Sequence, residues 1–148
     1  MKNKITIFTI ILHLFINQVI AGNIEYNLTN AINRDDLEHV KELIEKGADV
    51  NQKQEPFNQA PIIISPLHGI DFIKLLLDNN ANINTKDQDN TTAIINSCLY
   101  GNLETTKYLI SKGADIHVVN NDGMSVLDAA KLSENRELIS YIKTLVKE

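Results

Sequence analysis

One nine-residue pattern occurs three times in the chain at a constant interval. Each copy is an apolar helical stretch followed by a stop at Gly47, Asn80 or Gly113, and successive stops are 33 residues apart. Glycine and asparagine tolerate the left-handed conformation that closes a helix. A fixed period of roughly 20–50 residues is typical of stacked repeats. The sequence therefore predicts a repeat protein. The three copies are residues 43–51, 76–84 and 109–117.

Residues 92–117 show the repeating unit most plainly. Thr92 begins a helical pattern, which Gly101 interrupts, and a second helical pattern then ends at Gly113. The apolar positions of each segment recur at helical spacing, which predicts two short helices separated by a tight connection. Those positions are Ile94, Ile95 and Cys98 in the first helix and Leu103, Thr106, Leu109 and Ile110 in the second.

This unit resembles the ankyrin repeat, which has a 33-residue period, a Thr-Pro-Leu-His-x-Ala start and two antiparallel helices. The segments 47–51 (Gly-Ala-Asp-Val-Asn) and 113–116 (Gly-Ala-Asp-Ile) are similar to the family's repeat ending. The resemblance implies an all-α fold, an ankyrin-repeat solenoid of about four helix-turn-helix repeats with short projecting β-turns. The expected domain is residues 22–148, with repeats at about 26–51, 52–84, 85–117 and 118–148.

The second repeat can be aligned to the family in two ways. Residues 65–68 (Ser-Pro-Leu-His) look like the family motif, but that choice leaves no room for a first helix before Asp71. We prefer residues 60–65, because Asn58 then takes the turn position that Asn90 and Gly123 hold in the next two repeats. All three residue types accept positive φ. This alignment predicts a short, irregular first helix that begins near Pro61 and is ended early by Pro66.

The histidine of the family motif is missing from this sequence. By resemblance, that histidine makes hydrogen bonds that tie neighbouring turns together. Ile63, Ile95 and Asp128 stand at the matching positions. We therefore expect this network to be largely absent, and the stack to be less stable than an array of consensus repeats.

The N-terminal segment is typical of a secretory signal peptide. Lys2 and Lys4 precede an almost wholly apolar run over residues 5–16, and Val19 and Ala21 are suited to the −3 and −1 positions of a cleavage site. The prediction is a signal peptide over residues 1–21, cut after Ala21 or, as the second choice, after Gly22. An uncleaved anchor, which would make the chain a membrane-tethered envelope scaffold, is disfavoured because spanning needs about 20 apolar residues. A lipid anchor is disfavoured because no cysteine lies near the cut.

Export changes what the composition implies about partners. Removing Lys2 and Lys4 takes the formal net charge from −5 to −7. An acidic surface repels nucleic acid and anionic membranes, so neither is an expected partner after signal cleavage. The only cysteine, Cys98, cannot form an internal disulfide, so packing alone must hold the fold. We expect a periplasmic or secreted monomer.

The sequence offers no pattern that favours catalysis, a metal or a cofactor. His13 is removed with the signal, and His39, His68 and His117 lie in three different repeats, so we expect surface or capping roles for them. Cys98 is expected to be a core thiol. The acid pairs Asp35-Asp36 and Asp87/Asp89 fall at helix caps and turns, and there is no glycine-rich phosphate loop. The chain is predicted not to be an enzyme.

Stacked repeats instead offer a continuous groove for another protein. The resemblance implies that partners contact the projecting turns and the exposed flank of each first helix. Exposed aromatic residues and methionine are enriched at interface centres, which favours Phe57, Tyr100 and Met124. The alternative is that Phe57 tucks under its own turn and Tyr100 covers the neighbouring repeat. The predicted partner-binding residues are Phe57, Asn58, His68, Asp87, Leu99, Tyr100, Asn121 and Met124.

Overall fold

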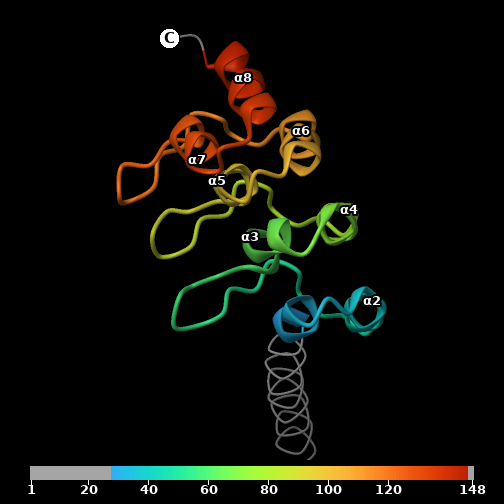
Figure 1. The fold of residues 1–148 in the computed structure, drawn as a ribbon. Coiled ribbons are helices and arrows are strands. Elements are labelled where there is room, and N and C mark those ends of the chain that lie inside the picture. Colours follow the sequence, from blue (N-terminus) through green and yellow to red (C-terminus); the bar gives the residue numbers. More distant parts are fainter. Residues whose placement is uncertain (1–27, 147–148) are drawn as a thin grey trace, which may run out of the picture.

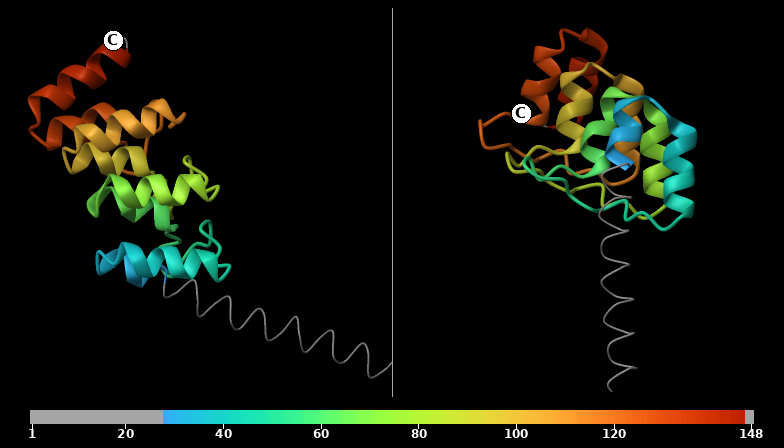
Figure 2. Two further views of the ribbon diagram at one scale, coloured as in Figure 1. Left: turned by 90° about the vertical axis from the view of Figure 1, so that its right-hand side faces the viewer. Right: turned by 90° about the horizontal axis from the view of Figure 1, so that it is seen from below.

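The computed structural model describes residues 28–146, in which four helix pairs stack along one axis (Figures 1 and 2). The predicted signal peptide lies outside these residues. The first members of the pairs are helical residues 28–33, α3 (Pro61–Ile64) with the 3₁₀ turn η1 (Ser65–Leu67), α5 (Ala93–Leu99) and α7 (Val126–Leu132). The second members are α2 (Leu37–Glu45), α4 (Ile70–Asp78), α6 (Leu103–Ser111) and α8 (Arg136–Leu145).

Long turns project from one side of this stack (Figure 1). They connect each second helix to the first helix of the next pair. The described residues contain no β-strand, only isolated bridges that join Gln54 to Gln59 and Val119 to Ser125 within two of the turns. An all-α solenoid with projecting turns is therefore confirmed.

The helix stops lie where the 33-residue period predicts them. Gly47, Asn80 and Gly113 have φ of 94°, 68° and 92°. After each stop, the next backbone N–H returns to a carbonyl in the last helical turn, as from Ala48 to Leu43 at 3.0 Å. This is the bonding of a left-handed helix terminus, so the same local chemistry ends three successive repeats.

The second repeat follows the preferred alignment. Asn58 has a φ of 54°, close to the 57° of Asn90, and α3 begins at Pro61. The first helix is only four residues long before it tightens into η1, which contains Pro66. The Ser65 hydroxyl donates to the Pro61 carbonyl at 2.8 Å. The predicted short and irregular first helix is confirmed, because a proline N has no hydrogen to donate to the helical ladder.

Asparagine or aspartate side chains begin three of the four second helices. Asp36 accepts from the His39 N–H at 3.0 Å, and Asn102 accepts from the Thr105 N–H at 3.0 Å. Asn135 accepts from the N–H groups of Glu137 and Leu138, both at 3.1 Å. These caps satisfy helix N–H groups that have no carbonyl partner. The exception is α4, which follows Gly69 and has no side-chain cap.

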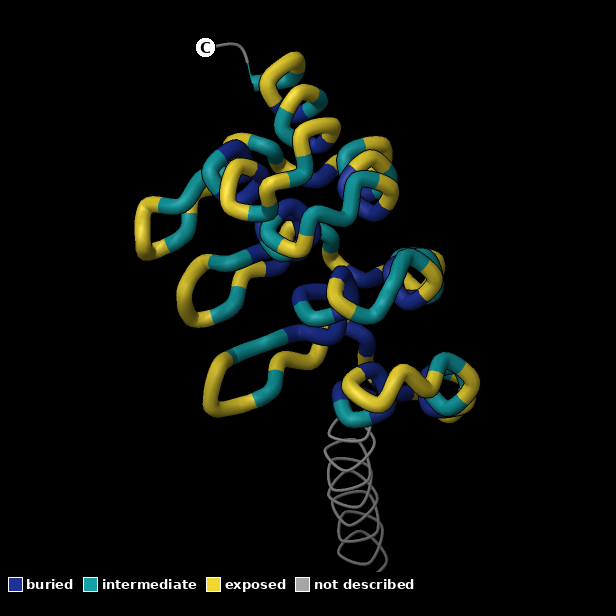
Figure 3. Tube along the Cα trace, in the orientation of Figure 1, coloured by how far each residue is buried: buried dark blue, intermediate teal, exposed yellow. Residues whose placement is uncertain are grey.

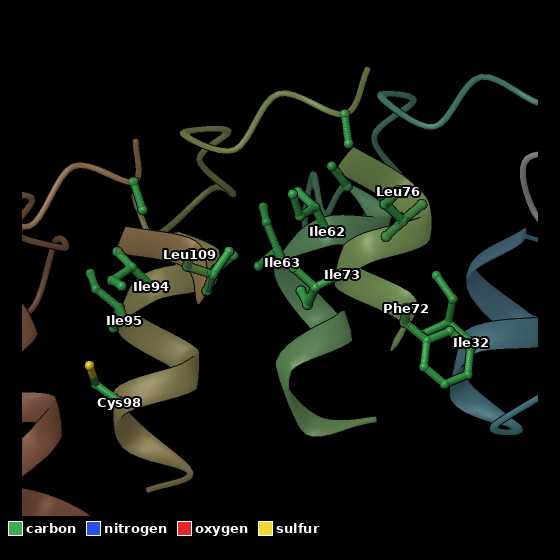
Figure 4. Packing of buried hydrophobic residues seen from close by; sticks show 14 of the residues in the cluster. Ile32, Ile62, Ile63, Phe72, Ile73, Leu76, Ile94, Ile95, Cys98 and Leu109 are labelled. Carbon is green, nitrogen blue, oxygen red and sulfur yellow. The ribbon is translucent and has the colours of Figure 1, made fainter. Parts of the chain in front are cut away.

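The core lies between neighbouring repeats rather than inside any one of them (Figures 3 and 4). Ile62, Ile73, Leu76 and Leu109 are 0% exposed, and Ile94 is 1% exposed. These side chains come from α3, α4, α5 and α6 and belong to one continuous cluster. The predicted shared interior is confirmed. Each repeat depends on its neighbours to shelter its apolar side chains.

Hydrogen bonds do tie neighbouring turns together, so the expectation of largely untied turns is wrong. Asn51 accepts from the Asn82 N–H at 2.7 Å and donates to the Asn80 carbonyl at 3.0 Å. Asn84 repeats this pattern, accepting from the Asp115 N–H at 2.9 Å and donating to the Gly113 carbonyl at 3.3 Å. The asparagine that ends each repeat thus holds the ending of the next one. We call these two residues the asparagine relay.

The positions of the missing motif histidine are otherwise as expected. Ile63 and Ile95 are 0% and 1% exposed, so these sites contribute apolar packing. Asp128 bonds within its own helix start, to Ser125. The turn tips are joined separately, through backbone bonds from Gln88 to Phe57 at 3.2 Å and from Asn121 to Asp89 at 2.8 Å.

Replacing Asn84 by alanine should lower the free energy of unfolding by about 1–2 kcal/mol, because two bonds between repeats are lost at a partly solvated site. Asn79→Ala is the matched control, since Asn79 donates only to Leu75 within its own helix. Its cost should be about 0.5 kcal/mol. Urea denaturation followed by circular dichroism measures both. Equal losses would contradict a stabilising relay between repeats.

Candidate protein-binding face

The projecting turns and the C-terminal ends of the first helices form one side of the molecule, which we call the turn face. Its turns are residues 52–59, 85–91 and 118–125, and its helix ends are residues 67–68, 99–100 and 132–133. Figure 1 shows the three turns projecting in the same direction from α3, α5 and α7. The backbone bonds between turn tips hold them at a fixed spacing.

Phe57 and Tyr100 are the most exposed aromatic side chains on this face. Phe57 is 55% exposed, and its backbone carbonyl, rather than its ring, links it to the next turn. Tyr100 caps the end of α5 and is 49% exposed. The alternative in which Phe57 tucks under its own turn is therefore wrong. Leu99 and Met124 are half-buried, each packed in part against the core.

The predicted polar residues of the face already have structural tasks in the turns. Asp87 accepts from the N–H groups of Asp89 and Thr91 at 2.9 and 2.8 Å. Asn121 donates its amide to the Gln88 carbonyl at 3.1 Å, and Asn58 supplies positive φ. These side chains set the shape of the turns, so their substitution would alter the face as well as any contact with a partner.

His68 is much less accessible than the sequence indicated. Its side chain is 9% exposed, and its Nδ1 lies 2.6 Å from Asp35 Oδ1 in the preceding repeat. The imidazole also meets the Phe72 ring edge-on, at 6.2 Å between centroids. The expected surface or capping role is therefore corrected for this histidine. His68 joins the first and second repeats, and the period alone did not reveal its cross-repeat partner.

Leu132 is an exposed residue of this face that the sequence analysis missed. Leu67, Leu99 and Leu132 are each the last residue of the first helical segment in their repeat. Leu67 is 59% and Leu132 is 62% exposed, whereas Leu99 is half-buried. The signal was available, because Leu132 follows Leu99 by one period of 33 residues. We call these three residues the leucine row.

The leucine row ends in a cleft at the fourth repeat. The cleft has a volume of about 320 Å³ and opens between the last turn and α7. Lys131 Nζ lies 3.4 Å from Asp128 Oδ1 at its edge. The Ser125 hydroxyl and backbone N–H donate to Asp128 and lower the pKa of its carboxyl. The lining residues are Asp122, Gly123, Met124, Asp128, Lys131 and Leu132.

Residues 28–146 hold no cluster of three or more histidine, cysteine, aspartate or glutamate side chains arranged to bind a metal. Cys98 is 0% exposed, and its Sγ lies 3.8 Å from Thr106 Oγ1. Burial raises the pKa of this thiol to about 11. The predicted core role of Cys98 is confirmed. Within the same residues, no helix has the length and apolar character needed to cross a membrane.

Cys98 should resist alkylation by iodoacetamide in the folded protein, because the thiol is both buried and protonated at neutral pH. Labelling should become complete in denaturing urea. Mass spectrometry of samples taken over time measures both rates. Equal rates in native buffer and in urea would show that the third repeat opens readily.

Comparison with protein families decides what kind of repeat this is. The family model described as "Ankyrin repeats (3 copies)" matches residues 28–120 and 62–147, which together span most of the chain. The chain belongs to the ankyrin-repeat family. Ankyrin repeats are generally protein–protein interaction modules without enzymatic activity. A comparison with curated proteins gave no match. The turn face is thus the surface of an ankyrin-repeat protein that is available to a protein partner.

Proposed function

We propose that this ankyrin-repeat protein is exported and binds another protein through its turn face. The observation that carries the proposal is the exposure of large apolar side chains on that face. Phe57, Tyr100 and Val119 are 55%, 49% and 49% exposed, although each adjoins a polar turn. Gathered apolar exposure of this kind marks interaction sites.

Phe57 and Tyr100 are the expected anchors of the interface. Aromatic side chains bury a large area on binding and are enriched among residues that dominate binding energy. The turns that carry Phe57 and Gln88 are joined by a backbone hydrogen bond, so the face is organised before a partner arrives. A surface organised in advance loses less conformational entropy on association.

Affinity capture with the mature chain tests this function. Proteins from envelope and culture-medium fractions are captured on the wild type, on a Phe57→Ala/Tyr100→Ala double variant and on Lys143→Ala. Lys143 is an exposed residue of α8 outside the turn face, so its variant is the control. A true partner should be recovered about tenfold less on the double variant and equally on the control. Failure to find any protein whose recovery falls in this way would overturn the proposal.

Export is a separate part of the proposal, and it rests on residues 1–21. Mass spectrometry of the mature protein should find Gly22 or Asn23 as its first residue. Retention of Met1 or Lys2 would contradict cleavage and favour a membrane-tethered scaffold. Light scattering of the mature chain should give the mass of a monomer.

A further inference from the structure

We propose that the partner segment is an amphipathic α-helix with basic flanks, which lies along the leucine row. This inference rests on the proposed function and names the class of partner. Leu67, Leu99 and Leu132 occupy the same place in three consecutive repeats. They present one apolar side chain per repeat, in line with the axis of the stack.

The spacing of the row favours a helix over an extended segment. Packed helices lie about 8–10 Å apart, so successive leucines are separated by about one such step. Seven residues of α-helix advance about 10.5 Å and return to nearly the same face. An extended strand covers that distance in about three residues, which point to opposite faces. Only a helix with apolar residues seven apart therefore meets all three leucines with one face.

The charges beside the row favour a basic partner. The two turns that flank Leu99 and Leu132, residues 85–91 and 118–125, contain three aspartates and one lysine. Exposed Glu134 follows α7 directly. In the terminal cleft, Lys131 pairs with Asp128, which leaves Asp122 unbalanced there. Such an acidic border attracts lysine and arginine on the flanks of an approaching helix.

The first repeat sets the limit of this site. Asn33 and Arg34 stand where the third repeat has Leu99 and Tyr100, 66 residues later. Both are exposed, so the apolar row stops at the second repeat and meets a positive charge. Lys53, also near this end, donates its ammonium to the Lys86 carbonyl at 2.7 Å. A basic helix would therefore engage the second to fourth repeats, through about 15 of its residues.

A peptide selection tests the class of partner. Random peptides of about 20 residues, long enough to span the row as a helix, are displayed on phage and selected on the mature wild-type chain. Enriched peptides are then synthesised and titrated against wild type, Leu67→Ser/Leu132→Ser and Leu67→Met/Leu132→Met. The methionine variant keeps the row apolar and is the matched control. Both leucines are mostly exposed, so thermal unfolding of each variant should remain close to wild type.

We expect enriched peptides to carry apolar residues seven apart and a net positive charge, and to become helical when bound. Their affinity should fall about tenfold on the serine variant and little on the methionine variant. It should also weaken with added salt. Enrichment of acidic or proline-interrupted peptides that still need Phe57 and Tyr100 would overturn this inference and leave the proposed function standing. Peptides insensitive to every turn-face substitution would overturn both.

Discussion

Replacing Leu109 by alanine should lower the free energy of unfolding by about 2–5 kcal/mol, the usual cost of emptying a fully packed leucine site. Leu109 lies in α6 and is 0% exposed within the cluster that joins neighbouring repeats (Figure 4). A domain of ordinary stability has about 5–15 kcal/mol in total. The substitution should therefore remove a large share of the stability of the stack.

Leu132→Ala is the matched control for this prediction, because it makes the same chemical change at a side chain that is 62% exposed. Surface substitutions usually alter stability by less than about 0.5 kcal/mol. Urea denaturation of both variants, followed by circular dichroism, gives the comparison. Similar losses at the two positions would show that Leu109 does not belong to a shared interior.

Replacing Gly101 by alanine should cost about 2–3 kcal/mol, more than a left-handed backbone position alone explains. Gly101 has a φ of 70°, and a new Cβ there would lie 3.3 Å from the Cβ of Ser133 in the next repeat. The Gly101 carbonyl also accepts a bond from the Asn135 side chain at 2.8 Å. The two repeats meet closely at this point, so a methyl group must push them apart or distort the bond.

Gly113→Ala separates the two causes of this loss. Gly113 has a φ of 92°, but a Cβ added there meets nothing within 4 Å. It should cost only the backbone strain of about 1–2 kcal/mol. Thermal or urea unfolding of both variants measures the difference. If Gly113→Ala were as costly as Gly101→Ala, the close approach of Ser133 would contribute nothing.

The sequence was sufficient to predict the architecture because the signals that set it are local and repeated. Each helix stop depends on one residue that tolerates positive φ, and the 33-residue interval places the same stop in the next repeat. The short helix at Pro61 was predictable for the same reason, since proline acts on its own turn. Burial of Ile94 and Leu109 then follows from helical spacing.

Contacts between repeats were harder to predict because they depend on how one turn faces the next. The asparagine relay uses a residue at the end of the repeat, whereas the family resemblance directed attention to the motif histidine. The partnership of His68 with Asp35 crosses two repeats through one irregular segment. Leu132 was missed for a different reason: the fourth repeat was interpreted from its buried positions, and the period was not applied to its exposed ones.

The asparagine relay has a consequence for how this molecule could change in length. Asn51 and Asn84 each bond to groups 29 and 31 residues ahead. A duplicated copy of residues 52–84, inserted directly after Asn84, would meet matching groups at both of its junctions. It would also bring its own equivalent of Leu67. Tandem duplication could thus extend the reach of the protein by whole units, with no new chemistry required at the joins.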